Sequence, residues 1–491
     1  MVSFRDIPQN LRVPLFYAEL DPSRANSGAT TMRALIIGQQ LAAGTYAAGT
    51  PVLMEGVDAV KAAAGAGSML ALMAEWYRKR DSFGEVYLLP LADPGAGAAA
   101  AGSAIINSVP TSPGTLNLYI AGQRVQLLVS PSQTVAQIAT ALAAAINALA
   151  DLPVTAAAST GTVTMTAKHK GLAAGAIDLR LNYLGAAGGE TTPAGLSVTL
   201  APISGGTTNP SVDAALANLS DQEFDVIVFP YTDTGSLTSI RTFMAARWAW
   251  DKMLYGHAFA GFRGTLGEST TFGLALNDPH LTVMPANGSP TPPWLWAANA
   301  AGAFAASLRA DVGLPLHGLP LDVLAPPLAS RWSIAERNVL LWDGLSSFSV
   351  AGDGTVTTET IVTTYQRNAA GVPDDSYLYV ERGYVLAAVI RDLRAFVTST
   401  YGRFKLASDT TAYRPGARII TPAVIEDALL GRYRELERQG LVQEYETFRA
   451  ALVVERDGTN RCRVNGLLPV VPIDQFRVFA GLVQFRNAQE V

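Results

Sequence analysis

Apolar residues alternate with other residues near both ends of the chain. The segment 475–485, QFRVFAGLVQF, carries large apolar side chains on both alternating sets of positions, which is typical of an extended strand. These side chains are Phe476, Val478, Phe479, Leu482, Val483 and Phe485. The segment 11–19 repeats the alternation with Leu11, Val13, Leu15 and Tyr17. Because chain ends fray unless something holds them, the pattern predicts two extended arms, residues 1–30 and 475–491, that pair with a partner strand.

The pattern changes after residue 32. A short apolar run at 33–38 precedes a helical pattern at 68–80, and a second apolar run follows at 85–91. The order strand, helix, strand is typical of an α/β layer. Apolar runs and amphipathic helices return in the same order after residue 209. The sequence therefore predicts an α/β core in two parts, residues 31–92 and 209–344.

A compact module interrupts this core. A Gly/Ala-rich stretch at 92–104 is expected to be a linker, and two alternating segments then flank the tight turn at Ala121-Gly122. A helix is expected from Thr134, whose spacing to Gln137 fits a capping box. Further alternating segments lie before a Gly/Thr-rich stretch at 204–210. Residues 93–208 are therefore predicted to form an inserted, β-rich α+β domain.

The last third of the chain combines hairpins and helices. Alternating segments around Asp353-Gly354 predict a hairpin, and helical periodicity predicts long helices from Ser376 and over 421–440. Strands are expected at 447–456 and 460–470. We expect residues 345–474 to form a C-terminal α+β domain, which makes the whole chain an α/β and α+β multidomain protein. The segment 475–485 either closes a sheet with residues 450–456 of its own chain or crosses to a neighbour.

Composition narrows the possible partners. Of the 491 residues, 49% are apolar and 16% are charged, below the charged fraction of about 25% usual in soluble proteins. Such a composition indicates surface that an assembly partner covers. The net charge of −5 and the lack of a Lys/Arg-rich run argue against nucleic-acid binding. No apolar run of membrane-spanning length and no secretory signal pattern are present, so no membrane insertion and a cytosol-like compartment are expected.

Motifs for catalysis, cofactors or metals are missing from the sequence. It contains no P-loop, no G-x-S-x-G, no H-E-x-x-H and no cysteine pair, so we expect no catalytic, cofactor or metal site. The single Cys462 is expected to be a small buried or strand-facing side chain.

Two other functions are compatible with the residues. His257 and Ser269 could join Asp225 or Asp233 as the triad of a serine hydrolase, although a triad is defined by geometry rather than by sequence. Alternatively, residues 93–208 could make the chain a surface carbohydrate-binding protein. The tryptophans are expected in a core or interface rather than on a sugar-binding platform; they are Trp248, Trp250, Trp294 and Trp296.

Five stretches together resemble the contractile tail sheath proteins of Mu-like phages. They are DIPQNLRVPLFYAELDPS at 6–23, GHAFAGFRGTLGESTTFGLALNDPHLTVMP at 256–285, LAPPLASRWSIAERNVLLWDGLSSFSV at 324–350, TTYQRNAAGVPDDSYLYV at 363–380 and LLPVVPIDQFRVFAGLVQFR at 467–486. The resemblance covers essentially the whole chain, in order.

The resemblance implies a virion tail protein that is assembled in the host cytoplasm. Hexameric rings of sheath subunits would stack around a tail tube and contract to drive that tube through the host envelope. The implied partners are further copies of the chain, the tail tube protein, and the baseplate and tail terminator proteins. The family gives its core the name subtilisin-like, but this brings no protease activity and no cofactor.

The resemblance also assigns residues to interfaces. In this family each arm adds a strand to a neighbour's C-terminal domain, which corresponds here to residues 11–19 and 475–485. The helix 421–440 resembles the tube-facing helix of sheaths, so Arg432, Arg434 and Arg438 are expected to contact the tube. The inserted domain resembles the outward-facing domains of sheaths.

Overall fold

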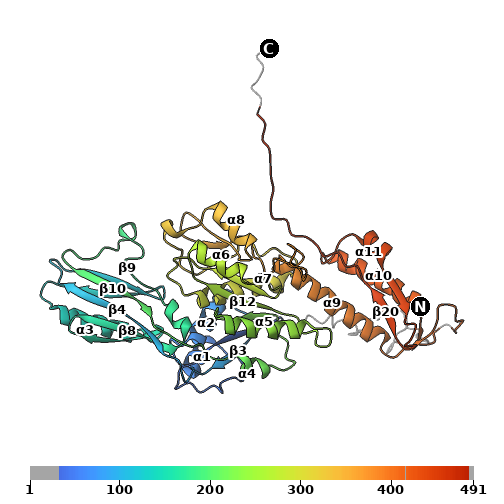
Figure 1. Cartoon of the computed structure of the whole chain (residues 1–491), viewed down its shortest axis with the longest axis horizontal. Coiled ribbons are helices and arrows are strands. Elements are labelled where there is room, and N and C mark those ends of the chain that lie inside the picture. Colours follow the sequence, from blue (N-terminus) through green and yellow to red (C-terminus); the bar gives the residue numbers. More distant parts are fainter. Residues whose placement is uncertain (1–31, 415, 486–491) are drawn as a thin grey trace, which may run out of the picture.

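The computed structural model describes residues 32–414 and 416–485. Figure 1 shows an elongated molecule with three parts in a row. The inserted domain lies at one end, a core built on a parallel sheet lies in the middle, and the long helix α9 leads to a helical region at the other end. The protein is thus a mixed α/β protein with several separate sheets, as the sequence predicts.

The central sheet has six strands in the order β13-β12-β11-β1-β3-β2. All neighbouring pairs are parallel except β2–β3. The strands are β1 (Arg33–Gln39), β2 (Val52–Leu53), β3 (Glu85–Leu91), β11 (Val226–Val228), β12 (His257–Phe262) and β13 (Leu281–Pro285). The first five strands of that order are almost fully buried, which explains their continuous apolar runs.

Helices surround the central sheet. They are α1 (Val57–Ala64), α2 (Met69–Arg78), α4 (Asp213–Ala217), α5 (Thr234–Trp248), α6 (Leu266–Leu274), α7 (Pro293–Ala310) and α8 (Ile334–Trp342), with a 3-10 turn at η4 (Leu328–Ser330). Of these, α2, α5 and α7 pack directly on the strands of the sheet. Helix α7 is buried nearly all round and contains Trp294 and Trp296. It packs closely on α2, where a Cβ at Gly302 would lie 2.4 Å from the carbonyl oxygen of Tyr77.

The inserted domain has its own hydrophobic core. It contains the sheets β10-β4-β8-β7 and β6-β5-β9 and the helix α3. The elements are β4 (Ala99–Ser108), β5 (Gly114–Ile120), β6 (Gln123–Val129), α3 (Val135–Ala148), β7 (Val154–Ser159), β8 (Thr162–Lys170), η2 (Leu172–Ala176), β9 (Leu179–Leu181), η3 (Ala186–Gly188) and β10 (Ser197–Ser204).

Two local predictions in the inserted domain are confirmed, and one is wrong. Ala121 and Gly122 form the hairpin turn with positive φ angles of 52° and 81°, and Thr134 and Gln137 form the capping box. The predicted Gly/Ala-rich linker instead contains strand β4. Small residues pair there because the neighbouring strand approaches closely: a Cβ at Gly102 would lie 2.7 Å from the Ala201 carbonyl oxygen.

The C-terminal third begins with a three-stranded sheet that packs on the central core. Its strands are β14 (Pro320–Leu321), β15 (Phe348–Val350) and β16 (Val356–Thr358). The side chains of Leu345, Phe348 and Val380 belong to the central hydrophobic cluster, although residues 345–474 were predicted to be a separate domain. The domain limits stay predictions, and the observed packing favours a later start near helix α9 (Val380–Tyr401).

The elements after α9 are β17 (Lys405–Leu406), β18 (Ile419–Ile420), α10 (Pro422–Arg438), α11 (Tyr445–Ala451), β19 (Val453–Arg456) and β20 (Val464–Leu467). A third hydrophobic cluster joins α9 to α10, α11 and β19. The strand predicted from residue 447 is wrong in its first half, which is helix α11. Phe448 and Leu452, four residues apart, share one core face, and Phe448 stacks on Tyr433 with ring centroids 3.8 Å apart.

The prediction for Cys462 is also wrong. Its side chain is exposed in the turn between β19 and β20. The strand β20 begins only at Val464, because the hydrogen bonds of Asp457 and Asn460 hold the preceding residues in a turn.

Candidate assembly interface

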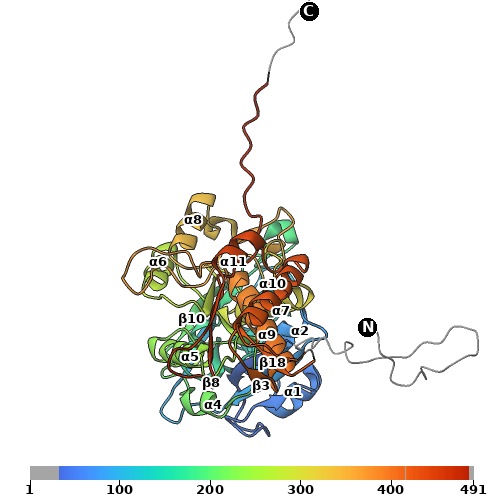
Figure 2. The same cartoon turned by 90° about the vertical axis from the view of Figure 1, so that its right-hand side faces the viewer.

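The described part of the C-terminal arm is attached to the molecule as far as Arg477, and residues 478–485 are free. The backbone amide of Gln443 donates to the carbonyl oxygen of Val471, and that of Ile473 donates to the carbonyl oxygen of Leu441. From Val478 to Phe485 the chain is extended and projects away from the body (Figures 1 and 2). Residues 478–485 have no strand partner within the described part of the chain.

The predicted interface side chains of this arm are exposed. All six are at least 76% exposed; they are Phe476, Val478, Phe479, Leu482, Val483 and Phe485. Six large apolar side chains in ten residues would not stay in water without a partner surface. The hypothesis that this segment closes a sheet with residues 450–456 of its own chain is wrong, since residues 475–485 pair with no strand in the described part of the chain.

The N-terminal arm lies outside the described residues. This applies to all four of its predicted interface side chains, which are Leu11, Val13, Leu15 and Tyr17. Their pairing with a neighbour stays a prediction.

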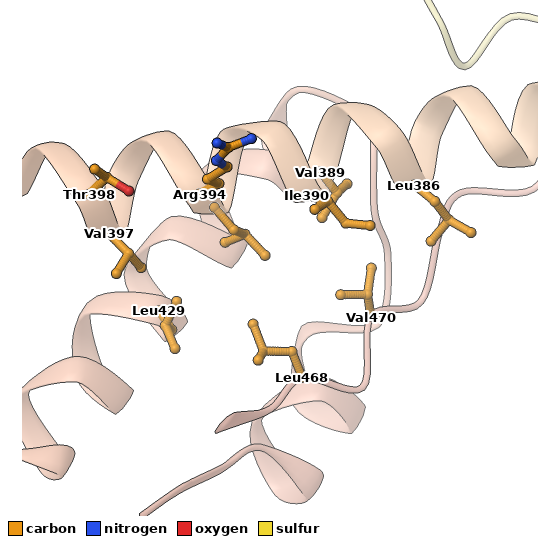
Figure 3. A pocket seen from close by; sticks show the side chains of 10 residues that line it. Leu386, Val389, Ile390, Arg394, Val397, Thr398, Leu429, Leu468 and Val470 are labelled. Atoms are coloured by element: carbon orange, nitrogen blue, oxygen red, sulfur yellow. The ribbon is translucent and has the colours of Figure 1, made fainter. Parts of the chain in front are cut away.

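An apolar groove lies between α9, α10 and the segment that follows β20 (Figure 3). Its volume is about 650 Å³. The lining is almost entirely aliphatic and consists of Leu386, Val389, Ile390, Leu393, Arg394, Val397, Thr398, Leu429, Leu468 and Val470. Sequence reasoning did not find this groove. The i, i+3, i+4, i+7 spacing of Leu386, Val389, Ile390 and Leu393 was present, but it could not distinguish an open groove from a closed core.

The small sheet beside the groove has fewer strands than a sheet needs to be stable on its own. Strands β19 and β20 form a two-stranded sheet, and such a pair is marginal on its own in water. Val453 and Leu467, which lie opposite each other, are 46% and 63% exposed. A sheet with open edges and exposed apolar residues is a surface to which an added strand can bind.

The three arginines predicted to contact a tube have different surroundings on α10. Arg432 forms an ion pair with Asp392 of α9, so it holds the two helices together. The guanidinium of Arg434 lies 4.2 Å from the centroid of the Tyr445 ring. The Arg438 side chain is 74% exposed and pairs with Glu435 at 3.2 Å. Arg434 and Arg438 are therefore better placed than Arg432 to meet another protein.

The proposed catalytic triad is not assembled. Ser269 is fully buried inside α6, and its hydroxyl donates to the carbonyl oxygen of Gly264. His257 Nε2 lies 2.8 Å from the Thr282 hydroxyl, and burial lowers the pKa of His257 well below its ordinary value. The two aspartates serve other contacts: Asp225 pairs with Arg391 of α9, and Asp233 caps helix α5.

Side chains of the protein itself fill the place where α/β sheets commonly bind ligands. That place is the carboxyl end of the strands at the point where the strand order reverses, here between β1 and β11. Gln39 donates to Asp93 Oδ1 at 2.7 Å and accepts a hydrogen bond from Tyr231. His169, from the inserted domain, lies 2.8 Å from the same Asp93 oxygen. These contacts connect the inserted domain to the core.

The described residues contain neither a metal-binding cluster nor a membrane-spanning helix. Within residues 32–414 and 416–485, no group of three or more His, Cys, Asp or Glu side chains is arranged to hold a metal ion. No helix in that part of the chain is both long and apolar enough to span a membrane.

Comparisons with known proteins give the family. Residues 205–364 match the phage tail sheath protein central domain, and residues 372–486 match the phage tail sheath C-terminal domain. The Mu-like prophage FluMu tail sheath protein of Haemophilus influenzae is 37% identical over 486 residues, which cover 99% of each chain. The chain belongs to the Mu-like phage tail sheath proteins. The resemblance seen in the sequence is thereby confirmed.

Solved sheath structures are more distant from this tail sheath protein. The sheath tail protein of Desulfitobacterium hafniense is 15% identical, with a TM-score of 0.49, over 94% of this chain and 97% of its own. That of Listeria innocua is 13% identical, with a TM-score of 0.48, over 90% and 92%. In this chain, the region matching the sheath C-terminal domain includes α9, the groove, the β19–β20 sheet and the described part of the arm.

Proposed function

We propose that this tail sheath protein is a structural, non-enzymatic subunit that polymerises as stacked hexameric rings around a tail tube and contracts to drive the tube through the host envelope. Its partners are further copies of itself, the tail tube protein, and the baseplate and tail terminator proteins. It assembles in the host cytoplasm and functions in the virion tail. The observation that carries the proposal is one chain with both a free apolar arm and an open apolar groove.

The arm of one copy binds the C-terminal domain of another in this proposal. Residues 478–485 add a strand beside the β19–β20 sheet, and their apolar side chains enter the groove on α9. If roughly eight hydrogen bonds contribute about 0.5–1.5 kcal/mol net each, one arm contributes several kcal/mol after ordering costs. The aliphatic lining adds roughly 25 cal/mol per Å² of buried apolar area.

Such a contact is heterologous, because the arm and the groove are different surfaces. Heterologous contacts form rings when the rotation closes and helices when it does not. During contraction, the paired strands stay paired while the bodies repack as rigid units between two arrangements. The inserted domain lies at the opposite end of the molecule from α9 and α10 (Figure 1), whose residues line the groove, and this supports an outward-facing position for the domain.

Electron microscopy of the purified protein tests the proposal. Tubes or ring stacks with a regular cogged outline are the expected result at high protein concentration. Images that contain only monomers, across a range of concentrations and salt conditions, would contradict the proposed polymer.

A tube contact through α10 predicts a charge effect. Reversing Arg434 and Arg438 to Glu is expected to lower assembly on tubes about tenfold, through lost ion pairs with an acidic tube. Polymers formed without tubes should be unchanged, since neither side chain lines the groove. Arg449→Glu on α11 is the control, because its side chain is 59% exposed and also has an i, i+3 acidic partner. Equal loss in the control, or none in the variant, would contradict the tube contact.

A serine hydrolase is not favoured by the geometry, and a chemical probe checks this. A fluorophosphonate probe is expected to leave Ser269 unlabelled, because that hydroxyl is buried and has no histidine partner. Labelling is measured by peptide mass spectrometry, with a Ser269→Ala variant as the matched control. Stoichiometric labelling of Ser269 that the variant lacks would restore the hydrolase hypothesis.

A further inference from the structure

A buried ion pair lies at the root of the C-terminal arm, which is residues 474–477, where the arm leaves the body of the molecule. Arg477 Nη2 lies 2.9 Å from Glu381 Oε2. The Arg477 side chain is 12% exposed and that of Glu381 is fully buried. The guanidinium also lies 3.9 Å from the centroid of the Tyr379 ring. Arg477 thus points into the molecule, whereas its neighbours Phe476 and Val478 point into solvent.

Glu381 connects three segments that are far apart in the sequence. It lies in the first turn of α9, and its other oxygen, Oε1, accepts a hydrogen bond from the backbone amide of Leu316. The arm, α9 and the segment after α7 therefore meet at one carboxylate. Burying a charge is costly unless it is paired and hydrogen-bonded, and here both oxygens are used.

The first half of α9 is in turn fixed to the central sheet. The Tyr384 hydroxyl donates to the carbonyl oxygen of Asp225, at 2.8 Å. Arg391 bonds Asp225 at 2.8 Å and Glu223 at 2.7 Å. Through these contacts, Arg477 attaches the arm to the central core. The residues just before it, 471–473, are attached to the C-terminal domain instead.

We infer that the Arg477–Glu381 ion pair is a latch. While it is formed, the donated strand begins at Val478, and a tensile force on the arm is transmitted through the ion pair to the central core. The inference rests on the proposed sheath function. While the ion pair is formed, only the residues from Val478 onward can reach another copy, so the length of the connection between the two copies is fixed. With the latch open, residues 474–477 can also detach, because the contacts before it are exposed or long: Asp474 with Arg382 and Gln443, and Gln475 with the Gly313 carbonyl. The free segment then lengthens by about 13 Å at the rise of a strand.

Variants of Arg477 and Glu381 distinguish an effect on the position of the donated strand from an effect on the stability of the fold. Arg477→Met keeps an apolar stem but leaves the Glu381 charge buried and unpaired, so the melting temperature of the monomer should fall. The double variant Arg477→Met/Glu381→Gln removes that charge and keeps an acceptor for the Leu316 amide, so the melting temperature should return toward that of the wild type. Both variants should still assemble poorly, with the critical concentration for polymers raised about tenfold. Arg382→Met is the matched control, because its partner Asp474 is 68% exposed, and it should change assembly less than about twofold.

A second measurement uses the monomer alone. Trypsin cleavage after Arg477 should be slow in the wild type and about tenfold faster in Glu381→Gln, because proteolysis follows the population of the opened arm root. Equal cleavage rates, or a double variant that assembles like the wild type, would overturn the latch. A wild-type protein that never polymerises would instead reject the proposed function, while the cleavage rates would still decide whether the latch exists.

Discussion

Deleting residues 478–491 is expected to abolish polymer formation and to leave a folded, soluble monomer. The described residues removed are exposed and make no strand pairing in their own chain, so the melting temperature should change by less than about 2 °C. The Arg477–Glu381 pair remains in this truncation. A contact worth several kcal/mol is lost, so the critical concentration should rise by at least about 100-fold. Sedimentation and electron microscopy measure the loss.

The matched control keeps the length of the arm and its large apolar side chains. Ala480→Ser combined with Gln484→Ala changes only small or polar residues of the described arm. This variant should polymerise like the wild type. Polymers of normal appearance from the truncated protein would reject strand donation by the C-terminal arm.

Placing a charge in the groove is expected to prevent polymer formation from the accepting side. Ile390 lines the groove and is already 38% exposed, so Ile390→Asp should leave the monomer folded. A carboxylate among aliphatic side chains has to lose water when an apolar strand binds. The critical concentration should therefore rise about 30-fold or more.

Ala395→Asp is the control for the groove variant. It adds the same charge to an exposed position of the same helix, and Ala395 does not line the groove. Its polymers should be normal. Equal loss of assembly in the two variants would show that charge on α9, rather than the groove, matters.

A mixture of the truncated protein and the Ile390→Asp variant tests whether this arm binds this groove. The truncated protein can accept an arm but has none to donate, whereas Ile390→Asp can donate an arm but accepts one poorly. A one-to-one mixture should form dimers and no long polymers, as measured by analytical ultracentrifugation. Long polymers from the mixture, or no association at all, would contradict the pairing of this arm with this groove.

Most of the local structure could be predicted from the sequence. The continuous apolar runs of β1 and β3 predicted strands of an α/β layer, and Thr134 with Gln137 predicted a helix start; the structure confirms both. Such signals depend on residues a few positions apart. Predictions were wrong where tertiary neighbours changed the outcome: β4 is a strand because another backbone accepts its small residues, and α11 is a helix because Tyr433 packs on Phe448.

The candidate interface also has one part that the sequence predicted and one part that only the structure decided. Alternation at 475–485 determined that the end of the chain is extended and apolar, and the absence of a partner motif left open where it binds. Only the tertiary structure decided that β19 pairs with β20, that the arm is free from Val478, and that Arg477 turns inward to Glu381. A period-two pattern records which side chains share a face, but not which surface covers that face. That depends on contacts between segments roughly a hundred residues apart, such as Arg477 with Glu381, which no local pattern encodes.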